Sequence, residues 1–315
     1  MVKDLISVIS PVYGDKRNVR LLYDKLTSVL TKMDVDYEII LVNDCCPYGS
    51  GEEIEKLALA DTHVKFIDLS RNFGQHYAIK AGIDYAKGDY AVVMDCDLQD
   101  NPEDIPKFYE KIKEGYDIVF GVRAQRQDSK FKKFLSDCFG FIQKHLSDFY
   151  SEYDHGNFSI ISKKVIDSFK NINNYNFNYC TQLYFLGYNP QYINIEKEQR
   201  AEGESGYNII KGMKLALKSL ISNSNKPLVF AAYCSFIMFV LSFCFIIKLV
   251  FDYFIFHNKL LGWTSIMASL FLIGGLLFVY LSILGLYIGG IFQEVKNRPL
   301  YIVRKTINTE RNENE

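Results

Sequence analysis

Two long uncharged segments near the C-terminus constrain this chain more than any other feature. Pro227–Ile247 contains no charged side chain over 21 residues, and Leu260–Gln293 contains none over 34. About 20 apolar residues span the hydrocarbon core of a bilayer, so each segment is long enough to cross once. Two buried core helices are the alternative, but helices of soluble proteins carry a polar stripe, and these segments have almost none. The sequence therefore predicts a hairpin of two membrane-spanning helices.

Basic residues on the outer flanks of these segments predict how the hairpin is oriented. Lysines and arginines concentrate on the cytosolic side of membrane proteins. The link between the two segments carries little net charge, whereas both outer flanks are basic: Lys211, Lys214, Lys218 and Lys226 on one side, and Lys296, Arg298, Arg304 and Lys305 on the other. The sequence therefore predicts a multi-pass protein whose termini and large N-terminal part are cytosolic.

Two further segments, Asn208–Ser222 and Lys130–Tyr150, combine apolar residues at helical spacing with several lysines. Basic amphipathic helices of this kind lie on anionic membrane surfaces, and packing onto the core of the N-terminal domain is the alternative. The predicted parts are a cytosolic domain (1–207), an interfacial helix (208–226), two transmembrane helices (227–251 and 263–290) and a cytosolic tail (291–315). We expect the polar end of that tail, Asn308–Glu315, to be disordered.

The N-terminal part alternates short apolar runs with amphipathic helical patterns. The predicted strands are Leu5–Ile9, Tyr37–Val42, Val64–Leu69, Tyr90–Met94 and Ile118–Phe120, and the predicted helices are Val19–Met33, Glu52–Ala60, Gln75–Ala86 and Pro102–Lys113. Strands that alternate with helices of this length form a mostly parallel α/β sheet with helices on both faces. Ligands of such sheets bind at the carboxyl ends of the strands, so we expect the chemistry there.

Composition and missing motifs argue against several classes of function. The 36 lysines and arginines are balanced by 37 acidic residues, which argues against nucleic acid as a partner. The seven cysteines are scattered without a Cys-x-x-Cys pair, so neither a disulfide framework nor a zinc site is expected. No glycine-rich phosphate-binding motif follows a predicted strand, which disfavours a Rossmann dinucleotide site and a P-loop.

Asp95 and Asp97 follow the fourth predicted strand. In an extended segment residues i and i+2 project to the same side, so both carboxylates can face one cation. A hard cation such as Mg²⁺ or Mn²⁺ relieves the repulsion between them and bridges substrate phosphates, and Gln99 offers a further neutral oxygen. An acidic strand-end turn explains the pair equally well. A haloacid-dehalogenase-type phosphatase is disfavoured, because there the pair follows the first strand and precedes Gly-Thr.

Stretches spread over nearly the whole chain match one enzyme family. They are Ser7–Tyr13, Glu38–Asp44, Arg71–His76, Gly88–Asp100, Gly121–Ser129, Arg200–Tyr207 and Gly285–Tyr301. Through them the chain resembles inverting family 2 glycosyltransferases of the GT-A fold. Within these it is similar to polyprenyl-phosphate glycosyltransferases, such as dolichol-phosphate mannosyltransferase, bactoprenol glucosyltransferase and the undecaprenyl-phosphate formamido-arabinose transferase.

The resemblance implies roles for individual residues. The implied nucleotide-sugar pocket contains Pro11, Tyr13, Asp15, Asp44, Asp95 and Asp97, and the implied metal site contains Asp95, Asp97 and Gln99. The implied cradle for the acceptor phosphate contains Arg123, Lys133, Ser136 and Arg200. The implied catalytic residues are Asp95, Asp97, Arg123 and Arg200. Arginine suits a phosphate because its planar fork pairs with two phosphate oxygens.

Asp44 and the cations of the cradle also have a simpler explanation. Asp44 is explained by an Asx turn, and the cations by ordinary solvated surface charges. Lys132 or Arg126 can take the place of Lys133. For His76 we expect a packing or hydrogen-bonding role rather than a catalytic one.

The chain departs from the pattern that the resemblance implies. Asn157 stands in a Gly-Asn-Phe stretch where many relatives have Gly-Asp-Phe, so a carboxylate sometimes suggested as a base is replaced by an amide. We expect no base to be needed there, because a lipid monophosphate, with a second pKa of about 6, is already an oxyanion at neutral pH. Gly206, Leu286 and Gly290 also differ from residues usual in these relatives, which bears on the particular sugar rather than the reaction.

The resulting hypothesis is a glycosyltransferase of the bacterial cytoplasmic membrane. It moves a sugar from a nucleotide-sugar, with a UDP-sugar favoured, to undecaprenyl phosphate or a similar polyprenyl phosphate on the cytosolic leaflet, with inversion and with Mg²⁺ or Mn²⁺. The sugar, the base, the pathway and a homo-oligomer are left open. The alternatives are a membrane-anchored family 2 transferase with a glycan acceptor, and a non-catalytic membrane partner with a decayed site.

Overall fold

The computed structural model describes residues 3–14, 16–123, 155–175, 177–195, 226–256 and 262–309. The chain divides into two compact units. One comprises Met1–Ser129, Ser151–Ser205 and Arg298–Glu315, and the other comprises Lys130–Tyr150 and Gly206–Asn297. Both predicted amphipathic segments, apart from Lys226 at the end of the interfacial helix, lie outside the described residues.

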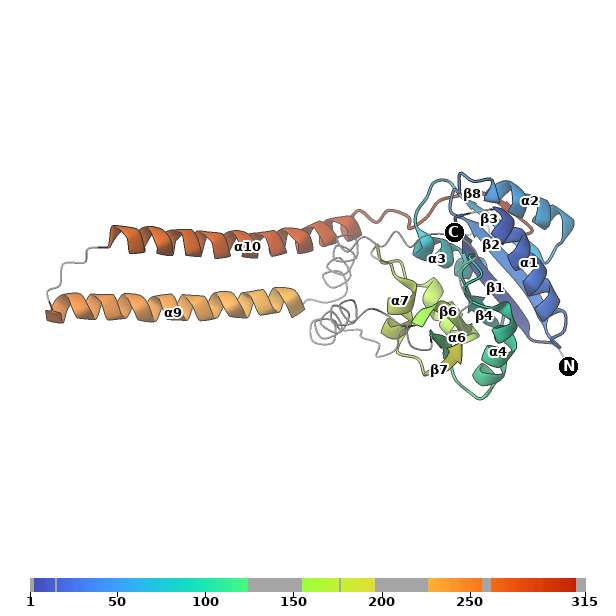
Figure 1. Cartoon of the computed structure of the whole chain (residues 1–315), viewed down its shortest axis with the longest axis horizontal. Helices are drawn as coiled ribbons and strands as arrows, with labels where there is room; N and C mark the ends of the chain where they lie inside the picture. The colour runs from blue at the N-terminus through green and yellow to red at the C-terminus, as the bar shows by residue number, and fades with distance from the viewer. Residues whose placement is uncertain are drawn as a thin grey trace. The chain divides into compact units, whose positions relative to one another are not determined.

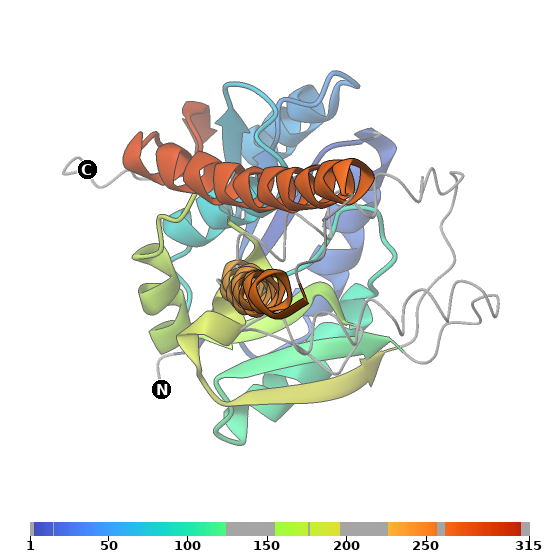
Figure 2. The same ribbon diagram turned by 90° about the vertical axis from the view of Figure 1, so that its left-hand side faces the viewer.

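The first unit is built on one sheet of eight strands, among the described residues, in the order β7-β5-β6-β4-β1-β2-β3-β8 (Figures 1 and 2). The strands are β1 Leu5–Val12, β2 Asp36–Asn43, β3 Val64–Leu69, β4 Tyr90–Val93, β5 Ile118–Arg123, β6 His155–Ser162, β7 Pro190–Ile195 and β8 Val303–Ile307. The pairs β1–β2, β1–β4, β2–β3 and β5–β7 are parallel. In Figure 2 the green β5 and the yellow β7 lie side by side at one edge.

Helices cover both faces of this sheet. They are α1 Lys16–Leu30, α2 Ser50–Ala60, α3 Gln75–Tyr85, α4 Ile105–Lys113 after a 3₁₀ turn at Pro102–Asp104, α6 Lys163–Lys170 and α7 Tyr179–Leu186. One core cluster joins alternate strand residues such as Ile39 and Leu41 to α1, α2 and α4. The other joins the intervening residues Ile40 and Val42 to α3, α6 and α7. Because the central strands are buried on both faces, their sequences read as continuous apolar runs.

The predicted fold class is confirmed. Each of the five predicted strands is present, and Val64–Leu69 has the predicted bounds. The sequence did not predict β6, β7 or β8. Strand β6 is antiparallel and lies between β4 and β5, and β7 is largely half-exposed, so neither has the pattern of a buried parallel strand.

The C-terminal segment belongs to this sheet. Strand β8 pairs antiparallel with β3, for example Ile67 with Thr306, and it follows the last apolar helix in the sequence. The expectation of disorder from Asn308 onward is wrong at Asn308 itself, because its Nδ2 donates to the carbonyl oxygens of Ala58 (2.6 Å) and Val64 (2.9 Å). The residues after 309 lie outside the described part of the chain.

The second unit contains α9, Lys226–Phe256, and α10, Trp263–Val295, which run in opposite directions (Figure 1). Within α10, Leu272–Val295 is long and apolar enough to cross a membrane, and large side chains such as Leu277 and Phe278 are exposed. In α9 the described residues give a shorter apolar stretch, Leu228–Ile237. The described residues thus contain one candidate span, and the second span and the orientation stay predictions.

Candidate active site

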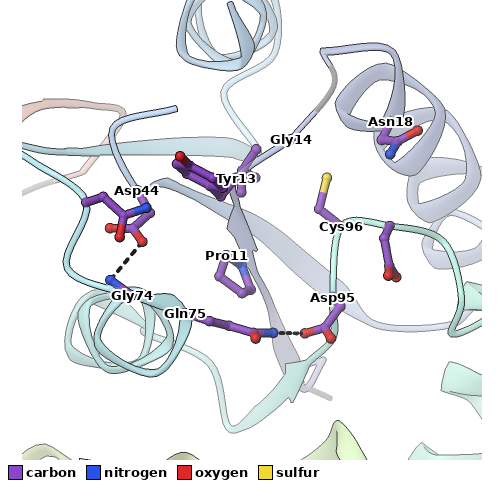
Figure 3. A pocket seen from close by; sticks show the side chains of 12 residues that line it. Pro11, Tyr13, Gly14, Asn18, Asp44, Gly74, Gln75, Asp95 and Cys96 are labelled. Carbon is purple, nitrogen blue, oxygen red and sulfur yellow. Dashed lines mark hydrogen bonds between the residues drawn. The ribbon is translucent and has the colours of Figure 1, made fainter. Parts of the chain in front are cut away.

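A cavity of about 380 Å³ opens where β1, β2, β3 and β4 end (Figure 3). It is lined by Pro11, Val12, Tyr13, Gly14, Asn18, Asp44, Asn72, Gly74, Gln75, Asp95, Cys96 and Asp97. These residues come from the end of β1, from the segments that follow the four strands and from the first turns of α1 and α3. The cavity therefore lies at the strand edge where ligands of parallel sheets bind.

The first side of the cavity follows β1. The side chain of Tyr13 is 55% exposed, and its ring packs edge-on against the ring of Tyr48, with 6.4 Å between the centroids. Gly14 is tied to the segment after β2, because its N–H donates to Cys46 Sγ (3.3 Å) and its carbonyl oxygen accepts from Ser50 Oγ (2.5 Å). Asp15 lies outside the described residues.

Asp44 connects two of the strand ends. Its side chain is buried, Oδ1 accepts from the N–H of Phe73 (2.7 Å), and Oδ2 accepts from the N–H of Gly74 (2.9 Å). Burial raises the pKa of Asp44, while these two N–H groups and the charge of Arg71 act in the opposite direction. An Asx turn is a local contact, so these bonds to the loop after β3 do not match that simpler explanation. Asp44 fixes this loop against the cavity.

Gly74 has a backbone conformation that favours glycine. Its φ is +105°, and it immediately precedes the first residue of α3. This conformation directs the Gly74 N–H at Asp44 and starts the helix with Gln75 facing Asp95 (Figure 3).

Two side-chain amides donate to the same oxygen of Asp95. Gln75 Nε2 lies 2.5 Å from Asp95 Oδ1, and Asn157 Nδ2 lies 3.4 Å from it. Strand pairing explains the second contact, because β4 and β6 are antiparallel with Val93 opposite Ser159, and two residues further Asp95 comes opposite Asn157. A carboxylate only accepts hydrogen bonds, so both amides must turn their NH₂ groups toward it.

Asp97 also lines the cavity, at the other end of a tight turn. Its Oδ1 accepts from the N–H of Gln99 (3.1 Å), and Leu98 between them has a φ of +58°. Gln99 is only 5% exposed and is not among the residues that line the cavity. Its role as a metal ligand stays a prediction. Between the two aspartates, burial and both carboxylates raise the pKa of Cys96 to about 12, so its thiol stays protonated at neutral pH.

Asp95 and Asp97 fit a divalent cation that is shared with substrate. Among the described residues, no three His, Cys, Asp or Glu side chains gather as a complete metal site. Mg²⁺ and chemically similar cations need only one or two carboxylates when substrate phosphates and water supply the other oxygens. The two carboxylates in the cavity lining match that donor set.

The structure brings together five of the proposed site residues and leaves the acceptor side undescribed. Pro11, Tyr13, Asp44, Asp95 and Asp97 line one cavity. Arg123 is the last residue of β5, but its side chain lies outside the described part of the chain, as do Lys133, Ser136 and Arg200 entirely. The acceptor-phosphate cradle therefore stays a prediction.

Several residues that line the cavity were assigned no role from the sequence. They are Asn18, Asn72, Gly74, Gln75 and Cys96. The stretch Arg71–His76 follows a strand end, and that position was the available signal. His76 itself is half-buried, and its Nε2 lies 3.0 Å from Nδ2 of Asn178, whose Oδ1 caps α7. This contact agrees with the expected hydrogen-bonding role.

Comparison of the sequence with known proteins identifies the family of the chain. Residues 7–170, more than half of the chain, match the family described as glycosyl transferase family 2. The uncharacterized glycosyltransferase YkcC of Bacillus subtilis is 34% identical over 305 residues, which cover 96% of this chain and 94% of that one. The SfII prophage-derived bactoprenol glucosyl transferase of Shigella flexneri is 30% identical over 302 residues, which cover 96% and 98%.

Solved structures agree on the fold. Glucosyl-3-phosphoglycerate synthase from Mycobacterium tuberculosis, in complex with Mn²⁺, UDP-glucose and phosphoglyceric acid, superposes with a TM-score of 0.50 at 13% identity, covering 69% of this chain and 78% of that one. Mannosyl-3-phosphoglycerate synthase from Rubrobacter xylanophilus gives a TM-score of 0.50 at 12% identity, covering 70% and 73%. The fold is of the GT-A type, and the chain belongs to glycosyl transferase family 2 and is a glycosyltransferase.

Proposed function

We propose that this enzyme transfers a sugar from a nucleoside diphosphate donor, with a UDP-sugar favoured, to a polyprenyl phosphate such as undecaprenyl phosphate. The observation that carries the proposal is that Asp44, Asp95 and Asp97 line one cavity at the strand ends of the sheet. Relatives of nearly the same length are named bactoprenol glucosyl transferases, and a lipid acceptor is consistent with the apolar segment Leu272–Val295.

The cavity lining offers groups for both the base and the diphosphate of a nucleotide-sugar donor. The exposed ring of Tyr13 offers a face on which a base can stack, and Asn18 and Asn72 add polar groups to the same lining. In the same lining, Asp95 and Asp97 would hold Mg²⁺ or Mn²⁺ beside the diphosphate. When bound, such an ion stabilises the negative charge that develops on a departing diphosphate.

The residues of the chain are needed for positioning rather than for proton transfer. An oxygen of the lipid phosphate attacks the anomeric carbon from the side opposite the diphosphate, the bond from that carbon to the diphosphate breaks, and the configuration inverts. The attacking phosphate is already ionised near pH 7, since its second pKa is about 6. Asn157 has no basic group, and its amide orients Asp95 instead. Arg123, Lys133, Ser136 and Arg200 form the proposed cradle for the acceptor phosphate.

The membrane arrangement is part of the proposal. We place α9 and α10 as a hairpin in the bacterial cytoplasmic membrane, with the catalytic unit and both termini on the cytosolic side. Leu272–Val295 supports one crossing, and the basic residues on both flanks of the hairpin support the orientation.

Product analysis on the full-length protein tests the function. Purified protein in lipid nanodiscs receives Mn²⁺ or Mg²⁺, a panel of radiolabelled nucleotide-sugars and undecaprenyl phosphate, and the lipid product is identified by mass spectrometry. We expect one donor to give a lipid-linked monosaccharide. Asp97→Asn should lose this product. Glu103→Gln, which changes an exposed carboxylate outside the cavity lining, is its matched control and should keep the product. Donor hydrolysis or glycan labelling without a lipid product would favour the glycan-acceptor alternative, and no nucleotide binding at all would favour a non-catalytic partner.

A further inference from the structure

The C-terminal strand β8 is connected to the donor cavity by a continuous chain of hydrogen bonds. We infer that Arg304, on this strand, is a positioning residue for the donor cavity. The inference rests on the proposed function, because it concerns how tightly the nucleotide-sugar is held. Every residue of the chain of contacts lies in the unit that contains the sheet.

The first link is an ion pair with a buried carboxylate. Arg304 Nε and Nη2 lie 2.8 and 2.7 Å from Asp68 Oδ2. Asp68 is only 5% exposed, so its charge depends on partners within the protein. Its other oxygen, Oδ1, accepts from Asn43 Nδ2 at 2.8 Å. Arg304 and Asn43 thus hold the two oxygens of one buried group.

The second link runs from Asn43 to the cavity wall. Asn43 is the last residue of β2, and its Oδ1 accepts from the N–H of Cys46 (3.2 Å). The Cys46 thiol donates to the carbonyl oxygen of Gly14 (3.2 Å) and accepts from the N–H of Gly14 (3.3 Å). Gly14 lines the cavity. The chain from Arg304 to the donor cavity is therefore unbroken.

The packing around Asn43 leaves its amide little freedom. A Cβ placed on Gly51 would lie 2.8 Å from Asn43 Nδ2, so the first turn of α2 packs directly against this group. The same amide bonds Asp68 through Nδ2 and Cys46 through Oδ1, so its two contacts depend on one orientation. We expect loss of the Asp68 contact to disturb that orientation, and with it the position of Cys46 and Gly14.

The residue that precedes β8 supports the loop after β3, which also lines the cavity. The N–H of Ser70 donates to the carbonyl oxygen of Ile302 (2.9 Å), at the start of the loop that carries Asn72 and Gly74. The same loop supplies the two N–H groups that hold Asp44. Strand β8 and the residue before it thus support two segments of the cavity lining.

Residues in the strand and on both sides of it provide other anchors, so we expect the strand to stay docked when Arg304 alone is lost. Tyr301 Oη donates to Asp84 Oδ2 (2.7 Å), and Asn308 donates to carbonyl oxygens near α2. Lys305 pairs with Glu55 through side chains that are 47% and 38% exposed. Lys305 is therefore the matched control: a neighbouring cation on the same strand, whose partner does not line the cavity.

Calorimetry with UDP and Mn²⁺ on the full-length protein tests the inference. We expect Arg304→Gln to weaken UDP binding about tenfold. This is the lower end of the range of effects for residues that hydrogen-bond and orient metal ligands without touching the metal. In Arg304→Gln, KM for the donor should rise by a similar factor while kcat changes less than twofold. Arg304→Lys should recover part of the affinity for UDP. Lys305→Gln should bind UDP as the unmodified protein does. Asp68→Asn should weaken binding similarly, and adding Arg304→Gln to it should change little further, because the two residues act through one contact.

The outcomes separate this inference from the proposed function. If the unmodified protein binds neither UDP nor any other nucleoside diphosphate, the proposed function fails. If it binds UDP and Arg304→Gln binds as tightly as Lys305→Gln, the inference fails and the function stands. If Arg304→Gln does not fold, the double variant Asp68→Asn/Arg304→Gln, which leaves no unpaired buried charge, replaces it. Equal UDP affinity of that variant and Lys305→Gln would also overturn the inference.

Discussion

The side-chain amide of Asn157 donates to Oδ1 of Asp95 across 3.4 Å. The contact follows from the antiparallel pairing of β6 with β4. On the other side of Asn157, its Oδ1 accepts from the thiol of Cys180 at 3.6 Å. The amide is therefore oriented by both neighbours and points its donor at Asp95, which is a positioning role.

Asn157→Ala should leave a working enzyme. The contact is long, so its loss should cost about 1 kcal/mol, or roughly fivefold in kcat/KM. The measurement is steady-state transfer to the lipid acceptor with saturating Mn²⁺. Removing a true general acid or base costs about 10²–10⁴-fold, and a loss in that range would contradict the positioning role.

Gln75→Glu should be more damaging than Gln75→Ala. The amide of Gln75 now donates to Asp95 Oδ1 at 2.5 Å, and a glutamate would place a second negative charge there. Loss of the hydrogen bond alone should cost about 1.5 kcal/mol, roughly tenfold in kcat/KM, because the acceptor is charged. Like-charge repulsion adds to this in the glutamate variant. Transfer rates at pH 7 check the order, and a glutamate variant that equals the alanine variant would contradict it.

Acidification should weaken the binding of the nucleoside through Asp44. Burial raises the pKa of this carboxyl above the usual value near 3.8, so it takes up a proton at a higher pH than an exposed aspartate. Once protonated, Asp44 no longer offers two charged oxygens to the N–H groups of Phe73 and Gly74, so its hold on this loop weakens. We expect the uridine affinity of the unmodified protein to fall as the pH drops through this raised pKa. In Asp44→Asn the affinity should be lower than that of the unmodified protein at neutral pH, and it should not change with pH in this range.

The sign of the stability effect separates this loss from unfolding. Because the pKa of Asp44 is higher in the folded state, the folded state binds this proton more tightly than the unfolded chain does. Protonation of this group therefore increases the free energy of unfolding as the pH falls through the raised folded pKa toward the unfolded value. Uridine binding should weaken there without loss of the folded signal in circular dichroism. Unfolding that parallels the loss of binding would contradict this account.

The central sheet was predictable because its strands are buried on both faces. Within β2, for example, Ile39–Val42 alternate their side chains between two cores, which leaves a continuous apolar run. Strand β8 was not predictable in this way. Val303–Ile307 carries exposed basic residues, lies at the sheet edge and pairs with β3, which is far away in the sequence.

The site was predictable where charge and strand ends coincide, as at Asp44, Asp95 and Asp97. The neutral amides were not predictable, because Gln75 and Asn157 acquire their roles only through contacts. Asn157 meets Asp95 only because β6 inserts between β4 and β5, an arrangement that no local pattern records.

Calorimetric titration of UDP with and without Mn²⁺, on the unmodified protein, Asp97→Asn and Glu103→Gln, tests whether the two aspartates hold a cation. We expect Mn²⁺ to strengthen UDP binding in the unmodified protein and in Glu103→Gln, and Asp97→Asn to lose this enhancement together with sugar transfer. An Asp97→Asn protein that keeps the Mn²⁺ enhancement and full transfer activity would contradict the claim that Asp95 and Asp97 hold a cation beside the diphosphate.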